Sequence, residues 1–308
     1  MNILEVSNLN VTFPTNRGLI RASQNISFSV KEGEICVLVG ETGSGKSVIG
    51  QAVLNLLPAS ADVSGSILYA DMEILSLPES KFFKLRGREI ALIPQNPTGS
   101  LNPLMKGGRQ ISEVPALLEK SESERKIKVR QLLSSLSFSN PDLVAASYPY
   151  ELSGGMRQRL TTGIALASSP RLLVADEPTK GLDYAARKRT MEMFLEIKKR
   201  GNNSILVITH DLELGEAIGD TVGVLYSGEL VEFGSASEVF TSPMHPYTKG
   251  LIAAHPKNGL KPLPGVCPSL SHLPEGCYFR ERCRTPCESA VHPPMNEVCR
   301  RRVRCNRC

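Results

Sequence analysis

The chain contains no tryptophan, few other aromatic residues and no long apolar run. Aromatic side chains make up 5% of its 308 residues, whereas 41% are hydrophobic and 22% are charged. No stretch approaches the roughly 18 uninterrupted apolar residues of a membrane-spanning helix. The N-terminus, from Met1 to Glu5, lacks the charged-then-apolar pattern of a signal peptide. We therefore expect a chain that does not cross a membrane by itself, is not marked for export and buries a sizeable core.

Residues 1–258 have no net charge and only one cysteine, Cys36. Between Gly259 and Cys308, nine lysines and arginines face four acidic residues, and this excess equals the net charge of +5 of the whole chain. The same segment holds seven of the eight cysteines. A second, chemically distinct module is therefore expected to begin near residue 256.

Hydrophobic patterns predict strands that alternate with helices, and hence a mostly parallel α/β sheet with a helical insert. The expected strands lie at 3–6, 9–13, 26–30, 35–39, 172–175 and 205–208, and the expected helices at 48–57, 155–167 and 184–200. Ser121 and Glu124 have the spacing of a capping box, as do Ser235 and Glu238. The first box precedes an apolar stripe formed by Ile127, Leu132, Leu133 and Leu136.

A glycine-rich loop connects the expected strand 35–39 to the helix that follows it. It matches the phosphate-binding pattern G-x-x-x-x-G-K-[ST] with Gly40, Glu41, Thr42, Gly43, Ser44, Gly45, Lys46 and Ser47. The glycines let backbone N–H groups turn toward phosphate oxygens, and the helix adds the positive end of its dipole. Lys46 can reach the β- and γ-phosphates, and Ser47 can hold Mg²⁺. A purely structural glycine turn is the alternative, and the loop alone leaves GTPases, kinases and ATPases open.

A second expected anion site begins the helix at 155–167. Ser153, Gly154 and Gly155 place a hydroxyl and two glycines at its N-terminus. Because one nucleotide needs only one phosphate loop, we expect this site to bind nucleotide held by another subunit. An ordinary serine cap with permissive glycines is the alternative.

Two adjacent carboxylates, Asp176 and Glu177, end the expected buried strand 172–175. Asp176 is suited to coordinate Mg²⁺ through water, and Glu177 is suited to polarise an attacking water. His210 ends the next strand, which should place it beside the γ-phosphate, although a lone histidine there is usually structural. Gln95 follows a strand-like segment and is undistinguished by itself.

In this order, the motifs resemble the full set of the ABC ATPases over residues 3–240. The matching positions are a P-loop at 40–47, a Q-loop at Gln95, a signature at 152–156, a Walker B motif at 172–177, a D-loop at 180–183 and a switch histidine at His210. The resemblance implies an ABC-type nucleotide-binding domain at 1–240, with a P-loop core sheet, an antiparallel β subdomain and a helical subdomain at about 98–168.

The same resemblance implies ATP and Mg²⁺ as ligands and a head-to-tail dimer of two ATPase subunits. Lys46, Gln95, Glu177 and His210 would be catalytic, and Mg²⁺ would be held by Ser47, Gln95 and Asp176. Asp183 would contact the partner subunit, and Phe13 would stack on adenine unless it belongs to the core. One departure is Lys180-Gly181 in the D-loop, where Ser-Ala or Thr-Ala is more usual.

Residues 241–308 resemble the C-terminal extension of one importer branch. His245-Pro246-Tyr247-Thr248 and the segment around Gln95 look like those of the oligopeptide, dipeptide and nickel importers. That branch implies two membrane-spanning permease subunits, a second and usually different ATPase subunit, and an external binding protein. It implies a peripheral position on the cytoplasmic face of the cell membrane, with a nickel or metal-chelate importer as the alternative to a peptide importer.

Four cysteines near the C-terminus, Cys277, Cys283, Cys287 and Cys305, resemble the set with which many members of this branch end. In some of them it is understood to hold a [4Fe–4S] cluster. Zinc, disulfides or unligated thiols are the alternatives, and Cys267, Cys299 and Cys308 are additional. Nearby arginines should lower the thiol pKa values, or instead serve an acidic partner or lipid headgroups.

Two other classes of protein share some of these features. A soluble ABC ATPase that acts on nucleic acid or ribosomes is disfavoured by the single nucleotide domain and by the balanced charge of residues 1–258. A regulatory protein that binds ATP without turnover is disfavoured because Glu177 and His210 are both present. We therefore expect an ATPase that drives transport and has no nucleic-acid partner.

Overall fold

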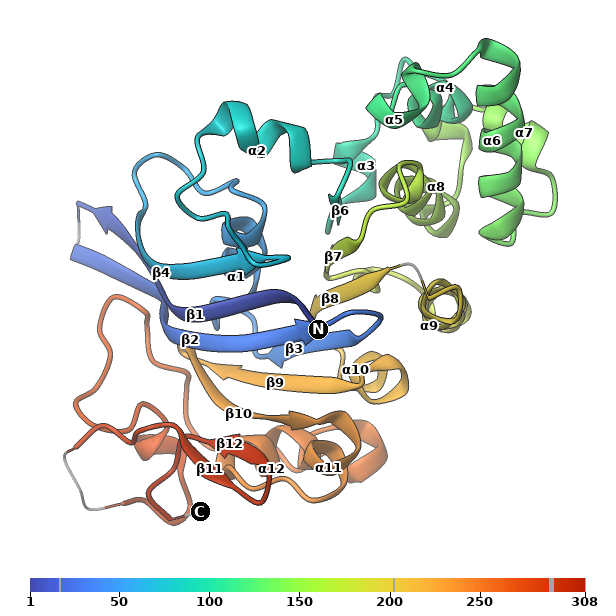
Figure 1. Cartoon of the computed structure of the whole chain (residues 1–308). Helices are drawn as coiled ribbons and strands as arrows, with labels where there is room; N and C mark the ends of the chain where they lie inside the picture. The colour runs from blue at the N-terminus through green and yellow to red at the C-terminus, as the bar shows by residue number, and fades with distance from the viewer. Residues whose placement is uncertain (17, 202, 288–290, 308) are drawn as a thin grey trace. The chain divides into compact units, whose positions relative to one another are not determined.

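The computed structural model describes residues 1–16, 18–201, 203–287 and 291–307, and the chain divides into two compact units. The first unit combines Met1–Ser76 with Val207–Cys308, and the second unit is Leu77–Leu206. The division falls within β8 (Ser204–Thr209), a strand whose six residues are all buried. Residues 241–308 therefore belong to the same unit as the N-terminal strands (Figure 1).

An antiparallel sheet in the order β2-β1-β4-β5 forms part of the first unit. Its strands are β1 (Asn2–Thr15), β2 (Gly18–Lys31), β4 (Asp62–Tyr69) and β5 (Met72–Glu73). In β1, Asn8 adopts a positive φ of 49°, and the register with β2 shifts between Val6 and Leu9. This bulge moves the buried positions from even to odd residue numbers. The separate strands expected at 3–6 and 9–13 are therefore one strand.

Five further strands of the first unit are neighbours in a second sheet, in the order β11-β12-β10-β9-β3. They are β3 (Ile35–Gly40), β9 (Thr221–Tyr226), β10 (Glu229–Ser235), β11 (Asn296–Val298) and β12 (Arg301–Val303). Every residue of β3 is buried, as its unalternating apolar sequence predicts. β3 and β9 are parallel, but the other pairs are antiparallel. The strands of this unit therefore pair in a mixed manner, because β10, β11 and β12 are joined through antiparallel pairs.

The helices of the first unit are short. They are α1 (Lys46–Val53), α10 (Leu212–Ile218), α11 (Ala236–Thr241) and α12 (Pro246–Ala253), with single 3₁₀ turns η2 (Pro256–Asn258) and η3 (Arg280–Arg282). α1 ends earlier than the expected residue 57 because Asn55 adopts a left-handed φ of 50°. The capping box expected at Ser235 does not form. Ser235 is the last residue of β10, and its hydroxyl contacts that of Ser237 at 2.9 Å.

The second unit contains the parallel strands β6 (Ile90–Ile93) and β7 (Leu172–Asp176), and most of the helices. The helices are α2 (Glu79–Leu85), α3 (Pro97–Ser100), α4 (Gly107–Ser112), α5 (Pro115–Leu118), α6 (Glu122–Ser135), α7 (Pro141–Ala146), η1 (Pro149–Glu151), α8 (Gly154–Leu166) and α9 (Tyr184–Lys199). None of the helices that the described residues form combines the length and the apolar character needed to span a bilayer.

The capping box expected at the start of α6 is present. Ser121 Oγ accepts a hydrogen bond from the Glu124 N–H, and a Glu124 carboxylate oxygen accepts one from the Ser121 N–H at 2.9 Å. The buried face of the segment carries Val129, Leu132, Leu133 and Leu136, which have helical spacing. The sequence pattern places Ile127 on this stripe, but Ile127 is 58% exposed. It lies two residues before Val129, so it falls on a different face of the helix.

Aromatic rings attach the C-terminal segment to the end of β9. Tyr226, Tyr247 and Phe279 are buried and mutually in contact, with ring centroids 4.6 to 5.5 Å apart. Such pairs contribute about 0.5–1.5 kcal/mol each beyond the apolar area that they bury. Burial also raises the pKa of Tyr226 to about 12, and its hydroxyl oxygen accepts a hydrogen bond from Arg282 at 3.4 Å. This cluster takes one residue from β9, one from α12 and one from the cysteine-rich region.

Two carboxylates of β10 hold the same segment through polar contacts. Glu232 is fully buried, accepts a hydrogen bond from the His245 N–H at 2.9 Å and lies 3.5 Å from Arg301. Glu229 accepts a hydrogen bond from His292 at 2.8 Å. That bond, together with the negative charge of Glu229, raises the pKa of His292 against the opposing effect of burial. A buried carboxylate that loses its cation is costly, so these pairs fix where the tail lies.

His245 should make stability depend on pH. Burial lowers the pKa of His245 to about 3, and its neutral Nδ1 accepts a hydrogen bond from the Tyr247 N–H at 3.0 Å. The unfolded histidine titrates near pH 6.5, so below this pH the unfolded chain binds a proton that the folded chain does not bind. The free energy of unfolding should therefore fall as the pH falls, by at most about 1.4 kcal/mol per pH unit from this residue.

We predict that His245→Asn, which keeps an acceptor but does not titrate, makes this decline shallower between about pH 6.5 and pH 5. Denaturant unfolding of both proteins across that range measures the slope. His272→Asn is the control, because His272 is exposed. Equal slopes for wild type and His245→Asn would contradict the prediction.

Candidate nucleotide-binding site

The phosphate loop lies between β3 and α1, in the strand–loop–helix order that the sequence predicts. Gly45 precedes α1 with a left-handed φ of 93°. A Cβ added at Gly45 would lie 2.0 Å from the backbone oxygen of Ala22, so no larger residue fits there. Steric contact with β2 therefore adds to the positive φ in requiring glycine at this position.

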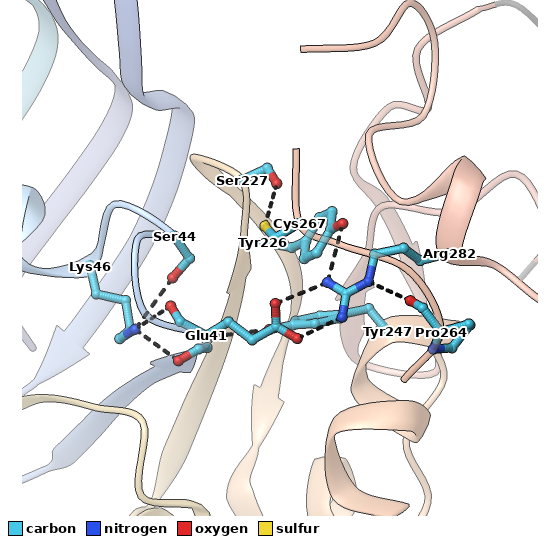
Figure 2. Close-up of polar contacts among 10 residues, drawn as sticks. Glu41, Ser44, Lys46, Tyr226, Ser227, Tyr247, Pro264, Cys267 and Arg282 are labelled. Atoms are coloured by element: carbon cyan, nitrogen blue, oxygen red, sulfur yellow. Dashed lines mark hydrogen bonds and ion pairs between the residues drawn. The ribbon is translucent and has the colours of Figure 1, made fainter. Parts of the chain in front are cut away.

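Lys46 is buried and lies over the loop itself. Its Nζ donates hydrogen bonds to the carbonyl oxygens of Gly40 (2.8 Å) and Glu41 (2.9 Å), and it lies 3.3 Å from Ser44 Oγ (Figure 2). Lys46 as a whole residue is 5% exposed, and Ser44 is 1% exposed. A buried cation held by loop carbonyls is suited to bind an anion at the loop. Ser47 occupies the second position of α1 and is half-buried.

In the second unit, β7 delivers Asp176 and Glu177 at its carboxyl end. The first four residues of the strand are buried, Asp176 is half-buried and Glu177 is 9% exposed. Glu177 adopts φ of 48°, a left-handed conformation that is rare for a residue other than glycine, asparagine or aspartate. Such backbone strain concentrates at functional sites, and it supports the role expected for Glu177.

The N-terminus of α8 is exposed at Ser153 and Gly154. Ser153 caps the helix by accepting a hydrogen bond from the Met156 N–H at 3.3 Å. A Cβ added at Gly154 would meet no atom of the described residues within 4 Å, so packing against those residues does not require glycine there. A Cβ at Gly155 would meet only Ala186 at 3.4 Å. The serine cap is present, and the open space above Gly154 leaves its backbone accessible to a ligand.

Known families and proteins match most of the chain. A family model described as ABC transporter matches residues 23–180, and one described as oligopeptide/dipeptide transporter, C-terminal region, matches residues 231–288. The oligopeptide transport ATP-binding protein OppD of Escherichia coli K12 is 40% identical over 98% of this chain and 92% of its own length. The chain belongs to the ABC transporter family. The dipeptide transport ATP-binding protein DppD of Bacillus subtilis 168 is 39% identical over 91% of this chain and 86% of its own length.

Solved ABC cassettes confirm the fold. The dimeric structure of MJ0796, a bacterial ABC transporter cassette, has a TM-score of 0.68 at 25% identity and covers 76% of this chain and 98% of its own. The structure of cbiO1 from Clostridium perfringens, part of an ABC transporter complex, has a TM-score of 0.68 at 27% identity and covers 78% and 91%. The ABC-type α/β fold expected from the motifs is therefore confirmed. ABC ATPases couple ATP hydrolysis to transport, so ATP with Mg²⁺ is the expected ligand.

The remaining ABC motif residues are distributed between the two units. Gln95 follows β6 and is exposed in the second unit, as is Asp183 at the start of α9. Asp183 caps α9 by accepting a hydrogen bond from the Ala186 N–H at 2.7 Å, and Lys180 in the same motif is exposed. His210 follows β8 in the first unit and is exposed. Phe13 is half-buried near the end of β1, so it is not part of the fully buried core.

The cysteine-rich segment does not behave as its composition suggests. Burial raises the pKa of Cys277, and nearby Cys305 and Cys283 raise it further, so the expected lowering by arginines is wrong for this thiol. The reason is that Arg282 and Arg304 bind carboxylates and carbonyl oxygens instead. Among the residues that the structure describes, no three His, Cys, Asp or Glu side chains are arranged to hold a metal ion, and Cys308 lies outside those residues. The described residues therefore give no support for the Fe–S or zinc site expected at Cys277, Cys283, Cys287 and Cys305, which stays a prediction.

The contacts also include two residues whose role the sequence does not reveal. Arg282 and Tyr247 both bind Glu41 of the phosphate loop. Glu41 and Arg282 are 241 residues apart, so no local pattern indicates their pairing. Tyr247 belongs to the His-Pro-Tyr-Thr motif, which identifies the branch but not this contact.

Gly45→Ala should abolish measurable MgATP binding, because the methyl group cannot coexist with the Ala22 carbonyl and would displace the loop. Isothermal titration of the purified chain measures the affinity. Gly33→Ala is the control, since Gly33 has a φ of 73° but nothing within 4 Å of an added Cβ. That variant should lose about 1–2 kcal/mol of stability and still bind MgATP. Normal MgATP binding by Gly45→Ala would contradict the steric argument.

Proposed function

We propose that this chain is the ATP-hydrolysing subunit of an ABC importer for oligopeptides or dipeptides. One observation carries the proposal. A phosphate loop with a buried Lys46 lies in a chain that aligns over 98% of its length with an oligopeptide transport ATP-binding protein. The match of residues 231–288 to the oligopeptide/dipeptide transporter C-terminal region favours peptides over nickel or metal chelates as cargo.

The proposed reaction is in-line attack of water on the γ-phosphate of ATP. Lys46 neutralises phosphate charge, and Mg²⁺ bound by Ser47, Asp176 and Gln95 adds to this effect. Glu177 polarises the attacking water, and His210 steadies the γ-phosphate. The buried position and strained backbone of Glu177 support its assignment as the base. Phe13, half-buried near the end of β1, is the proposed platform for adenine.

The proposed assembly is a head-to-tail pair of ATPase subunits. Ser153, Gly154 and Gly155 would bind the nucleotide held by the partner's phosphate loop, and Asp183 would contact that partner. The exposed N-terminus of α8 supports this role, because a Cβ added at Gly154 would contact none of the residues that the structure describes. The related MJ0796 cassette is described as dimeric.

The pair of ATPase subunits would act with two permease subunits, as a peripheral component on the cytoplasmic face of the cell membrane. An external binding protein would deliver the cargo to the permease subunits. The second ATPase subunit is proposed to be a paralogue. The ATPase domain is proposed to span residues 1–240 and the extension residues 241–308. The balanced charge of residues 1–258 supports a system without nucleic acid.

Glu177→Gln should leave MgATP binding intact and reduce ATP turnover by at least about 100-fold, because the amide cannot accept a proton from water. The measurement is phosphate release by the complex assembled with its permease subunits. Glu192→Gln is the matched control, because Glu192 is an exposed glutamate of α9. Near-normal turnover by Glu177→Gln would overturn the assignment of the base.

The cargo is tested in the same assembled complex. Proteoliposomes that contain the complete importer and its binding protein should accumulate a labelled di- or oligopeptide only when ATP is supplied, and Glu177→Gln should stop the uptake. ATP-dependent uptake of nickel without uptake of peptide would overturn the peptide assignment.

A further inference from the structure

The C-terminal segment contacts the phosphate loop through an ion pair whose arginine is buried and whose glutamate is partly exposed. Arg282, the last residue of η3, donates from Nη1 and Nη2 to the two carboxylate oxygens of Glu41, at 2.9 and 3.0 Å (Figure 2). The Arg282 side chain is 7% exposed and that of Glu41 is 27% exposed. A two-bond guanidinium–carboxylate pair fixes both the direction and the distance between its partners.

Arg282 is itself held in place by the segment that carries it. Its Nε donates to the Pro264 carbonyl oxygen at 2.9 Å, and Nη1 lies 3.4 Å from the Tyr226 hydroxyl. The guanidinium also lies over the Tyr226 ring, 5.6 Å from its centroid. Burial opposes its charge, but the bonds to Glu41 and Tyr226 outweigh burial and raise the pKa of Arg282. The guanidinium is therefore charged, and its contacts with Pro264 and Tyr226 orient it toward Glu41.

Glu41 is held at its backbone as well as at its side chain. The Glu41 N–H donates to the hydroxyl of Tyr247 at 3.0 Å, and Tyr247 is fully buried in the aromatic cluster. The Glu41 carbonyl oxygen accepts a hydrogen bond from Lys46 Nζ at 2.9 Å. One residue of the loop thus connects Arg282 and Tyr247 on its outer side to the phosphate-binding lysine on its inner side.

We propose that Arg282 is a positioning residue for ATP, which acts through Glu41 to hold the phosphate loop in the shape that binds phosphate. A phosphate loop works only when its N–H groups converge, and ordering a mobile loop on binding costs affinity. The Arg282–Glu41 pair orders the phosphate loop in the folded chain before ATP binds. The inference rests on the proposed function of Gly40–Ser47 as the ATP site, and it gives the C-terminal extension a part in that site.

The test is MgATP affinity of the full-length chain, measured by isothermal titration on Arg282→Met. The dissociation constant should rise about tenfold, as expected for losing about one charged hydrogen-bonding contact that orders the loop. Arg282→Lys, which keeps the charge but not the two-bond geometry, should lie between wild type and Arg282→Met. Arg280→Met is the matched control, because Arg280 lies on the same turn, is exposed and should bind MgATP as wild type does.

Glu41→Gln and Tyr247→Phe test the same connection from the loop side. Tyr247→Phe keeps the ring packing and removes only the acceptor of the Glu41 N–H, so it keeps the proposal testable even if Arg282→Met does not fold. Each single substitution should weaken MgATP binding. The dissociation constant of the double variant Glu41→Gln/Arg282→Met should not exceed the larger of the two single-variant dissociation constants. Additive effects of these two substitutions would overturn the proposal.

A tethering role alone would give a different result. If Arg282 only attaches the tail, Arg282→Met lowers the midpoint of thermal unfolding, while the MgATP affinity of Arg282→Met, Glu41→Gln and Tyr247→Phe stays within about twofold of wild type. That outcome would overturn the proposal. Lys46→Ala distinguishes failure of the positioning role from failure of the proposed ATP site. If wild type and Lys46→Ala bind MgATP equally, the assignment of the ATP site fails. If Lys46→Ala loses binding but the variants of Arg282, Glu41 and Tyr247 do not, only the positioning role fails.

Discussion

The parallel pairing of β3 with β9 is the constraint on which the arrangement of the first unit depends. Its register sets Gly40, the first residue of the phosphate loop, opposite Leu225, so Tyr226 and the turn that follows lie beside the loop. The Gly228 N–H then donates to the Ser44 carbonyl oxygen at 3.1 Å. Because both strands are almost completely buried, a shift of one residue would move every side chain to the opposite packed face of the sheet and disrupt the packing on both faces, so the register is strongly specified. Everything attached to the end of β9 is thereby brought to the phosphate site.

The buried aromatic cluster and the carboxylates of β10 then determine where the C-terminal segment lies. Arg301, Arg304 and Arg282, whose side chains are at most 8% exposed, are each directed at a carboxylate of the same unit. The excess positive charge of residues 259–308 is therefore partly neutralised inside the fold, by acidic residues of the balanced segment that precedes it. Composition alone would assign these basic residues to acidic partners or lipid headgroups. The three buried arginines instead bind carboxylates within the same unit.

Local features of the site could be predicted from the sequence, because each is contained in a short segment. The phosphate loop, the two carboxylates at the carboxyl end of β7 and the capping box at Ser121 all lie where their patterns indicate. Ser235 shows the limit of such patterns: it has the spacing of a capping box, but pairing with Thr221 keeps it in a strand and directs its hydroxyl elsewhere. The bulge at Asn8 is similar, since only the structure shows that one strand continues through it.

Arg282 marks the part of the site that sequence reasoning does not reach. Its pairing with Glu41 depends on the register of β3 with β9, on the packing of Phe279 against Tyr226 and on the path of the chain past Pro264. None of these is local, and the second residue of a phosphate loop carries no sequence signal of a partner. A buried ion pair is weak evidence for stability, because desolvation offsets much of its attraction. Its value lies in specificity: a guanidinium fixed by Pro264 and Tyr226 accepts the Glu41 carboxylate in one geometry, and that geometry fixes the carbonyl to which Lys46 is bonded.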